Sequence, residues 1–487
     1  MKRRTFLQTS AAAVTAAWTG TVCAQTPNRR DITYEPNQEL ESVGLRIRDV
    51  TKILKDGEKN NVHPILRDEI LENPNAVFII YAGVNTSREE KGSWKPVPDQ
   101  MERFGNRVSE LVFRSGTEKR GRTFIKPNLV GGLSRPNSVG NSHGGIVHPY
   151  FIVGMVDRLR DMGNRNIAIG ARGALRNPDV VKSGFQDLLD KHHLPLIQAH
   201  VQYFKDYEKS ELVWHKNPDG VVARRFCTYK PVFEKGTTFI NIAHAHVHPF
   251  GSTTLTLKNH QGVMPRGYGH TCDAWCSLDI WRREFMKDFN RDFRSTVEQS
   301  YIKHGNMGYK HWDHGDFYQQ YKNMGGYEAF KKTRDNYEKV RGDENERLKA
   351  LDDIYNIADS RLFLMEQWAQ RMMDQIEAFP HPYVSMVEGV FARGDDNGVL
   401  HGDFLTVGRS MVEVDSVTTW LMGHDPREVP YLRIANERGL GNNDIENITI
   451  YLLDERGITK VNDYRNLKRN PCGIHIYRLS NLGAQYF

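Results

Sequence analysis

The sequence predicts an α/β protein with a wound, mostly parallel sheet and a large helical insertion. Short apolar runs of strand length recur between residues 75 and 270 and return after residue 380, and stretches with helical spacing of apolar residues separate them. Between residues 271 and 379 the chain instead becomes charged and aromatic-rich, with long helical patterns. Alternating strands and helices are typical of a sheet whose strands run mostly parallel.

The predicted elements begin with the run NAVFIIYAGV, a short apolar strand at 75–84. The next run, RTFIKPNLV, is a second strand, and it is closed by Pro127 and the following Gly131 and Gly132. The segment at 150–162 has helical spacing and ends at Gly163, a suitable C-cap. After it we predict a strand, a helix and two further strands, at 166–170, 180–189, 194–201 and 237–248.

The strand pattern resumes after the insertion, with YVSMVEGVFA at 383–392 and FLTVG at 404–408. Helices are predicted to begin near Val412 and Arg427. The domain organisation that follows is a signal segment, a polar N-terminal arm, an α/β domain in two parts and a helical insertion, at 1–24, 25–74, 75–270 with 380–487, and 271–379.

The N-terminus has the features of an export signal. Arg3 and Arg4 precede Thr5-Phe6-Leu7, a weakly apolar stretch follows, and Val22-Cys23-Ala24 offers a small-residue cleavage site. The arginine pair predicts a twin-arginine signal, with the twin-arginine translocon as the partner during export. An ordinary secretory signal is the alternative. We therefore expect the mature chain to be periplasmic or otherwise exported.

Charge and hydropathy argue against two classes of partner. Removal of the signal segment takes away Lys2, Arg3 and Arg4 and lowers the formal net charge from +6 to about +3. A chain so close to charge balance gives little support for nucleic-acid binding, which needs a concentrated basic face. No segment of the mature chain approaches the ~18 consecutive apolar residues of a membrane span.

Four blocks, in this order, resemble the domain of unknown function 362 family. They are IKPNLVGG at 125–132, the segment at 240–265, MVEGVFARGDDNGVLHGDF at 386–404 and the segment at 414–441. The resemblance implies an α/β fold with Rossmann-like winding and a distant kinship with the nickel-dependent lactate racemase group. Many relatives carry a ferredoxin-like run of cysteines, which this chain lacks, so no iron–sulfur cluster is expected.

The chain departs from the family pattern in a second way. Where such relatives show a lysine pair before a histidine, roughly KLKTH, this sequence has the run HAHVH at 244–248. Only His248 matches the pattern, together with Lys258 and Asn259 downstream. An anion-binding role carried by the lysine pair of the relatives therefore does not transfer to this chain.

The HAHVH run is the sharpest candidate for a metal site. On a strand, His244, His246 and His248 would point to one face, ~7 Å apart along the strand. Two imidazoles so placed suit one metal ion, and Glu388 could complete the ligand set. The sequence leaves zinc, iron, manganese and nickel open. The alternative is a set of solvated or hydrogen-bonded histidines at the mouth of the sheet.

Residues at the ends of other strands are candidates for anion binding. Lys126 and Asn128 follow a buried strand, so both should emerge at the sheet edge where α/β proteins bind ligands. Lys258 and Asn259 lie on a turn or short helix that could face the same cleft. Gly144 and Gly145 precede a helix whose N-terminus suits an anion or a cofactor phosphate. Capping and surface polarity are the alternative roles of these residues.

The acidic loop at 386–404 could supply a general base. Glu388 and Asp403 are favoured over Asp395 and Asp396, whose DDNG sequence is also a good turn. Asp415, on the following helix, is expected to be structural, as a cap or a hydrogen bond between elements.

The combined prediction is an exported, metal-dependent enzyme that acts on a small anionic molecule. Lys126, Lys258 and Asp403 are the predicted catalytic residues, and Asn128, Asn259 and the two glycines are the predicted cofactor-binding ones. Two alternatives come from other classes of protein. One is a metal- or ligand-binding protein without turnover, for example in maturation, and the other is an electron-transfer protein.

Overall fold

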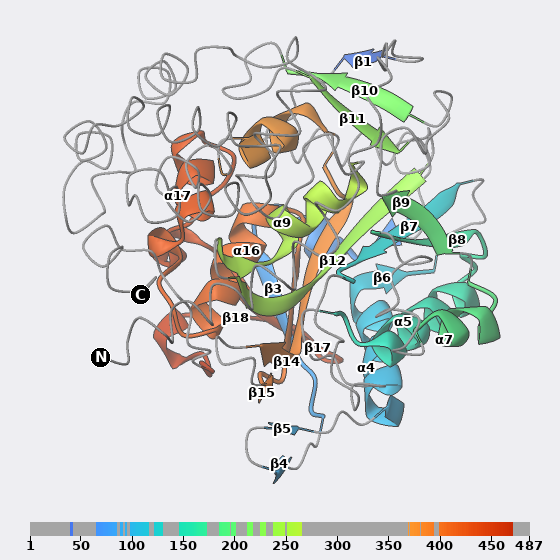
Figure 1. The fold of residues 1–487 in the computed structure, drawn as a ribbon. Helices are drawn as coiled ribbons and strands as arrows, with labels where there is room; N and C mark the ends of the chain where they lie inside the picture. The colour runs from blue at the N-terminus through green and yellow to red at the C-terminus, as the bar shows by residue number, and fades with distance from the viewer. Residues whose placement is uncertain are drawn as a thin grey trace, which may run out of the picture.

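A computed structural model gives the arrangement of the chain (Figure 1). The structure describes residues 65–84, 98–115, 121–129, 146–172, 185–194, 237–248, 251–264, 371–379, 381–393 and 399–470, with short pieces at 39–41, 88–90, 93–94, 196–200, 212–217, 225–229 and 369. The predicted signal segment, Gly144, Gly145 and most of the predicted insertion lie outside these ranges.

The largest sheet has eleven strands, in the order β18-β17-β3-β16-β14-β12-β7-β8-β9, with β13 beside β12 and β15 beside β14. Its strands are β3 (Val77–Tyr81), β7 (Arg122–Pro127), β8 (Ile167–Arg172), β9 (Leu196–His200), β12 (Thr237–His248), β13 (Ser252–Thr254), β14 (Val384–Arg393), β15 (Val399–His401), β16 (Phe404–Gly408), β17 (Ile450–Asp454) and β18 (Gly457–Lys460).

The centre of this sheet is largely parallel, as the alternation of strands and helices predicts. Strand β12 runs parallel to both β7 and β14, and β7, β8 and β9 are parallel to one another. The exception is β16, which is antiparallel to β14 and to β3. The chain between β14 and β16 is too short for a parallel crossover, which needs a dozen or more residues. The sheet is therefore mixed, and Rossmann-like winding stays a prediction.

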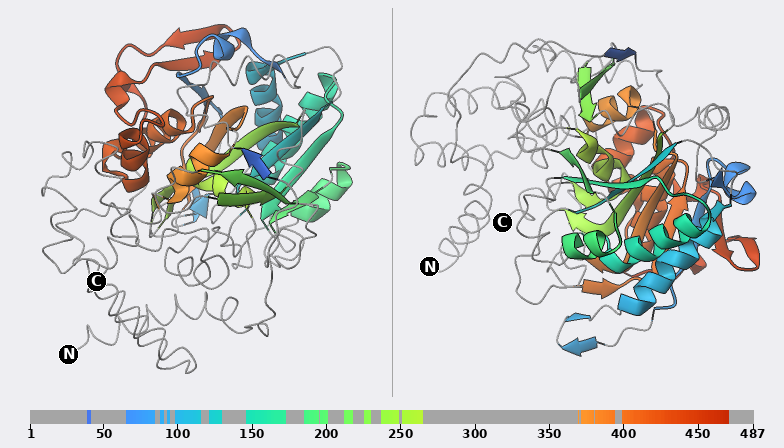
Figure 2. Two further views of the ribbon diagram at one scale, coloured as in Figure 1. Left: turned by 90° about the horizontal axis from the view of Figure 1, so that it is seen from above. Right: turned by 90° about the vertical axis from the view of Figure 1, so that its right-hand side faces the viewer.

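Helices cover both faces of the central sheet (Figures 1 and 2). Helices α4 (Pro98–Val112) and α5 (Pro149–Asp161) lie side by side on one face, which we call the α5 face. Helices α9 (Thr256–His260) and α16 (Met411–Leu421) lie on the other, which we call the α9 face. None of the helices that the structure describes is long and apolar enough to cross a membrane.

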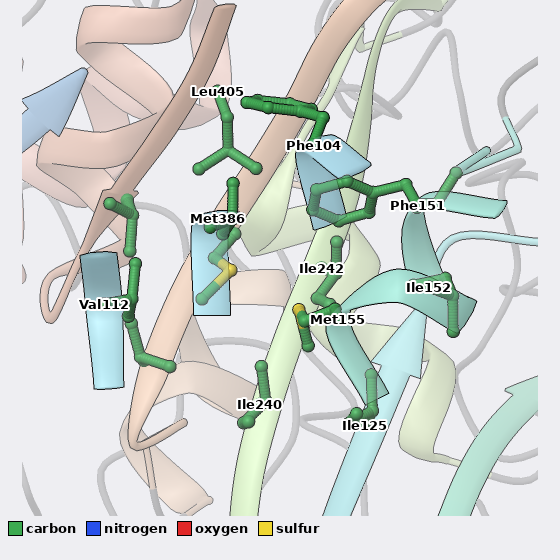
Figure 3. Packing of buried hydrophobic residues seen from close by; sticks show 14 of the residues in the cluster. Phe104, Val112, Ile125, Phe151, Ile152, Met155, Ile240, Ile242, Met386 and Leu405 are labelled. Atoms are coloured by element: carbon green, nitrogen blue, oxygen red, sulfur yellow. The ribbon is translucent and has the colours of Figure 1, made fainter. Parts of the chain in front are cut away.

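Alternation along β12 divides the hydrophobic core into two clusters. Ile240 and Ile242 pack on the α5 face with Met386 and with residues of α4 and α5 (Figure 3). Ala243 and Ala245 pack in the cluster on the α9 face, against residues of α16. Successive side chains of a strand point to opposite faces, so the position of a residue in β12 fixes the face on which it lies.

Close packing of α4 against α5 depends on two glycines. A Cβ atom at Gly105 would overlap the carbonyl oxygen of Phe151, and one at Gly154 would overlap that of Glu102. Because these oxygens belong to helix backbones, they have little room to move. The helices can therefore approach closely enough to bury Phe104 and Phe151 in one cluster, with ring centroids 5.6 Å apart.

Most predicted elements lie close to their predicted positions. Helix α5 spans Pro149–Asp161, and Gly163 has a φ of +96°, as its role at the C-terminus of this helix requires. Helix α7 (Phe185–Lys191) overlaps the helix predicted at 180–189, whose first five residues lie outside the described ranges. Helix α17 (Pro430–Glu437) begins at Pro430 rather than near Arg427, because a short 3-10 helix at 426–428 precedes it.

Other elements follow no strong sequence signal. Strands β10 (Leu212–Lys216) and β11 (Arg225–Tyr229) form a small sheet with β1 (Glu39–Glu41). The strand β2 (Ile65–Leu66) pairs with β6 (Phe113–Arg114), and helix α3 (Asp68–Leu71) follows β2 in the chain. The described end of the predicted insertion, residues 371–379, is buried and mostly helical.

Candidate functional site

The candidate site lies near the carboxyl ends of β7 and β12, beside the middle of β14. Lys126 is near the end of β7, and Asn128 follows it. His244 and His246 are near the end of β12, and Glu388 is paired with His244 on β14. All five side chains are at most 6% exposed. Ligands of α/β sheets bind at the carboxyl edge of the strands, so buried polar groups near it are the natural candidates for function.

A β-bulge in β14 sets the position of Glu388. His244 pairs with Glu388, but His246 pairs with Arg393, so β14 accommodates several extra residues between these pairs. Within the bulge, the Glu388 Oε1 atom accepts a hydrogen bond of 2.9 Å from the Val390 N–H. A Cβ atom at Gly389 would overlap the ring of Phe404, so this position requires glycine. Bulges commonly redirect a side chain beside an active site, and this one fixes the carboxyl of Glu388.

Glu388 lies between the end of β12 and the beginning of α5. Its Oε2 atom is 4.0 Å from His244 Nε2 and accepts a hydrogen bond of 3.3 Å from the backbone N–H of His148, the N-cap residue of α5. Burial raises the pKa of Glu388 to about 7, and backbone hydrogen bonds, including those from Val390 and His148, only partly oppose this shift. A carboxyl group with this pKa can exchange a proton near neutral pH.

His246 lies beside His244, as the alternation along the strand predicts. The centroids of the two rings are 5.8 Å apart. The Nδ1 atom of His246 is 3.0 Å from the carbonyl oxygen of His244 and donates to it. In the neutral ring this bond assigns the proton to Nδ1 and leaves the lone pair on Nε2, the arrangement of many metal-binding histidines. His248 ends β12, but its side chain lies outside the described part of the structure.

Two donor atoms on the α5 face are placed so that they could bind one metal ion. His244 Nε2 and Glu388 Oε2, at 4.0 Å, are close enough for one ion with bonds of about 2.0–2.2 Å to contact both. Within the described ranges, however, no three His, Cys, Asp or Glu side chains are grouped so that they could hold a metal ion. The pair therefore fits two ligands of a metal, and the third ligand is not defined by this arrangement.

A network of amides lies on the opposite face. Lys126 Nζ donates to Asn259 Oδ1 at 2.5 Å and is 3.4 Å from the carbonyl oxygen of Pro127. Asn259 Nδ2 is 2.7 Å from Asn241 Oδ1, 3.0 Å from the Ile242 oxygen and 3.2 Å from the Lys126 oxygen. Asn259 therefore joins the ends of β7 and β12. The side chains of this network are buried, and Lys126 is only 2% exposed.

Helix α9, which carries Lys258 and Asn259, is fixed by Asp415 of α16. The carboxyl group of Asp415 accepts hydrogen bonds from Thr256 N at 2.8 Å, Thr256 Oγ1 at 2.5 Å and Leu257 N at 2.9 Å. The structural role expected for Asp415 is thus confirmed, because it caps the N-terminus of α9 from a neighbouring helix. Lys258 is buried, and its ammonium group donates to Thr254 Oγ1 at 3.1 Å.

Asp403 is placed differently from the other predicted site residues. Its backbone has a φ of +60°, and its Oδ1 atom accepts a hydrogen bond of 2.8 Å from the Gly83 N–H. Its carbonyl oxygen accepts another, of 3.0 Å, from Ala82 N. These bonds tie the loop after β3 to the start of β16. A left-handed conformation held in this way has a clear structural role, while the predicted role as a general base stays a prediction.

The site residues, predicted to face one cleft, are thus divided between two faces of the sheet. His244 continues the α5-face positions of β12, and Glu388 lies opposite it. Lys126 pairs with Asn241, whose side chain contacts α9 and α16 on the other face. The histidines and Lys126 therefore lie on opposite faces, both near the carboxyl ends of their strands.

Asn241 is absent from the sequence prediction, and so is the contact of His148 with Glu388. Asn241 is the one strongly polar residue inside the apolar run FINIA, which is a usable signal for a buried amide. His148 directly precedes Pro149, a residue favoured in the first turn of a helix, so its place at the N-terminus of α5 has a sequence signal as well.

A comparison with protein families identifies the chain. A family model described as Domain of unknown function (DUF362) matches residues 123–420, more than half of the sequence. The chain belongs to this family. The matched segment of this DUF362 protein contains both faces of the site, from Lys126 to Asp415. No curated protein and no solved structure matches the chain.

Proposed function

We propose that this DUF362 protein is a metal-dependent enzyme that acts on a small anionic molecule. The observation that carries the proposal is the buried pair of His244 and Glu388, with 4.0 Å between Nε2 and Oε2, near the carboxyl end of β12. Burying a carboxyl and an imidazole is costly unless they are paired or bind a ligand. A buried pair of titratable groups of this kind marks a candidate functional site.

The proposed roles of the site residues follow from the face of the sheet on which each residue lies. His244 and Glu388 would hold the metal ion, with His246 or His248 as the third ligand. A bound ion there would polarise an oxygen of the substrate. Lys126 and Lys258, both buried on the other face, would hold the anionic group. Redox, isomerisation and lytic reactions are all compatible with these roles.

Metal analysis of the protein purified from its native compartment tests the proposal. We expect one zinc, iron, manganese or nickel ion per chain, and a fall of about tenfold or more in bound metal in His244→Ala and Glu388→Gln variants. His424→Gln, at a half-buried histidine beyond α16, is the matched control and should keep its metal. A metal-free wild-type protein that takes up none of these ions would contradict the proposal. Bound metal without any turnover would favour the non-catalytic alternative.

We also propose that the chain is exported by the twin-arginine pathway to the periplasm. Arg3, Arg4 and the small residues at 22–24 support this. An Arg3→Lys/Arg4→Lys variant is expected to stay in the cytoplasm as a precursor, since the arginine pair is the address that the translocon reads. Cell fractionation with immunoblotting measures this, with Lys2→Arg as the control. Unchanged export of the double variant would point to the ordinary secretory route.

Kinship with the lactate racemase group and Rossmann-like winding belong to the same proposal. The four sequence blocks at 125–132, 240–265, 386–404 and 414–441 support both, together with the parallel strands β12, β7, β8 and β9. All four blocks contribute residues to the carboxyl edge of the sheet or to the helices beside it.

A further inference from the structure

We propose that Asn128 and Lys126 form an oxyanion subsite on the α9 face, which binds a carboxylate or phosphate group. The inference rests on the proposed function only in taking the ligand to be anionic, and it does not depend on a metal ion. It assigns the anionic group to a place that is separate from the His244–Glu388 pair.

The backbone holds Asn128 in a fixed position at the end of β7. Its N–H donates to the Ile242 carbonyl oxygen at 2.8 Å, and its own carbonyl oxygen accepts a hydrogen bond of 3.0 Å from Val147 N. Ile125 and Leu129 both pack in the core of the α5 face. By alternation along the strand, Lys126 and Asn128 therefore point to the α9 face.

The side chain of Asn128 provides a buried donor that needs an acceptor. Asn128 is 1% exposed, and its Nδ2 atom has no hydrogen-bond partner among the residues that the structure describes. The neighbouring amides of Asn241 and Asn259, by contrast, bond to each other and to backbone oxygens. Leaving such a donor unsatisfied costs about 1–3 kcal/mol. An oxygen atom of a ligand, replaced by water when no ligand is bound, would remove this cost.

Lys126, two residues before Asn128 and on the same face, provides a positive charge. Among the contacts of its ammonium group are neutral oxygens of Asn259 and Pro127, and an anionic oxygen is a stronger acceptor than either. The ammonium lies against Gly262, where a Cβ atom would overlap Cε of Lys126 and come within 2.7 Å of its Nζ. The absence of a side chain at Gly262 is therefore what allows the ammonium to occupy this position.

An amide donor and an ammonium group on the same face of a strand end favour a particular class of ligand. Both groups donate hydrogen bonds, and one is charged, so they favour an oxygen that carries negative charge. Carboxylates and phosphates share this chemistry, whereas neutral carbonyl compounds lack the charge. Since His244 and Glu388 lie on the opposite face of the sheet, removing either of them should leave binding of the anion unchanged.

Binding of two simple anions to the full mature protein tests this subsite. Inorganic phosphate and succinate would each be titrated by calorimetry, so that the two sources of an oxyanion are distinguished. We expect at least one of them to saturate, and the Asn128→Leu and Gly262→Ala variants to bind it about tenfold more weakly, a loss of about 1.4 kcal/mol. Asn128→Leu should still fold, because an apolar group replaces an unsatisfied donor.

Two variants serve as controls. Thr238→Val removes another buried side-chain group without a partner in the described structure, but at the amino end of β12, and it should bind the anion as the wild type does. His244→Ala should also bind it normally, even if its metal is lost. Failure of both anions to bind, or equal binding by Asn128→Leu, Gly262→Ala and the wild type, would overturn the subsite. If the metal analysis contradicted the proposed function, the measured binding of the anion would still support the subsite.

Discussion

An Arg438→Met variant is expected to lose about 3–5 kcal/mol of unfolding free energy, because it removes the cation from a buried ion-pair network. Arg438 is 1% exposed, and its Nη2 atom is 2.9 Å from Asp374 Oδ1 and 2.7 Å from Glu377 Oε2. Without the guanidinium group, the carboxylates of Asp374 and Glu377 stay buried but lose a major source of the positive charge that stabilises them. Removing one partner of such a network costs far more than an exposed ion pair contributes.

Chemical denaturation measures this loss. The control is Arg456→Met, which removes the pair with Asp454; Arg456 is 91% exposed, and the variant should be nearly as stable as the wild type. Adding Asp374→Asn and Glu377→Gln to Arg438→Met should restore part of the stability, since no unpaired charge is then buried. A loss in Arg438→Met no larger than that of the control would show that the network does not hold the fold.

The network matters because it connects distant parts of the chain. Arg438 follows α17, whereas Asp374 and Glu377 belong to the described end of the predicted insertion. Asn217, after β10, donates to the carbonyl oxygen of Asp374 and to Glu377 Oε2. Phe379 packs against His260 of α9, with ring centroids 5.6 Å apart. The same segment therefore joins the small sheet, α17 and the helix that carries Lys258 and Asn259.

An Asp415→Ala variant is expected to lose about 3 kcal/mol of unfolding free energy, because three hydrogen bonds to the beginning of α9 disappear at once. The N–H groups of Thr256 and Leu257 would be left buried without their acceptor. Asp415→Asn should lose less, since its oxygen can still accept from Thr256. Asp425→Ala, at the exposed cap of a short helix at 426–428, is the control and should cost about 1 kcal/mol. A loss in Asp415→Ala no greater than this control would contradict the capping role.

The effect of Asp415 should also depend on pH. Burial raises the pKa of Asp415 to about 7 in the folded protein, from the ordinary value of 3.8. Between these values the folded state keeps a proton that the unfolded state releases, so the contribution of this group to stability is full below about pH 4 and declines as the pH rises through about 7. Unfolding measured from pH 4 to 8 should therefore show the advantage of the wild type over Asp415→Asn narrowing as the pH rises.

Much of the fold could be predicted because apolar periodicity reflects burial. The strand at 237–248 is recognisable from its sequence, and so is the common face of His244 and His246, since side chains alternate along a strand. By contrast, local sequence does not reveal that Lys126 and His244 lie on opposite faces of the sheet. Their placement depends on which strands pair and in what register, and these are set by contacts between distant segments rather than by local sequence.

The remaining differences have the same physical origin. The antiparallel direction of β16 follows from the short connection at 394–403, which local patterning describes only as a turn-rich loop. The bulge after Glu388 depends on how β14 pairs with β12. The buried segment at 371–379 contacts Arg438, more than sixty positions away in the sequence. A charged helical pattern does not reveal that one of its faces meets such a partner.

The central claim is that His244 and Glu388 are two ligands of one metal ion, and anomalous X-ray scattering tests it most directly. Crystals of the protein purified with its native metal would be measured above and below the absorption edge of that metal. The proposal predicts one anomalous peak within bonding distance of both His244 Nε2 and Glu388 Oε2, at about 2.0–2.5 Å. A peak elsewhere in the molecule, with none between these two atoms, would contradict it.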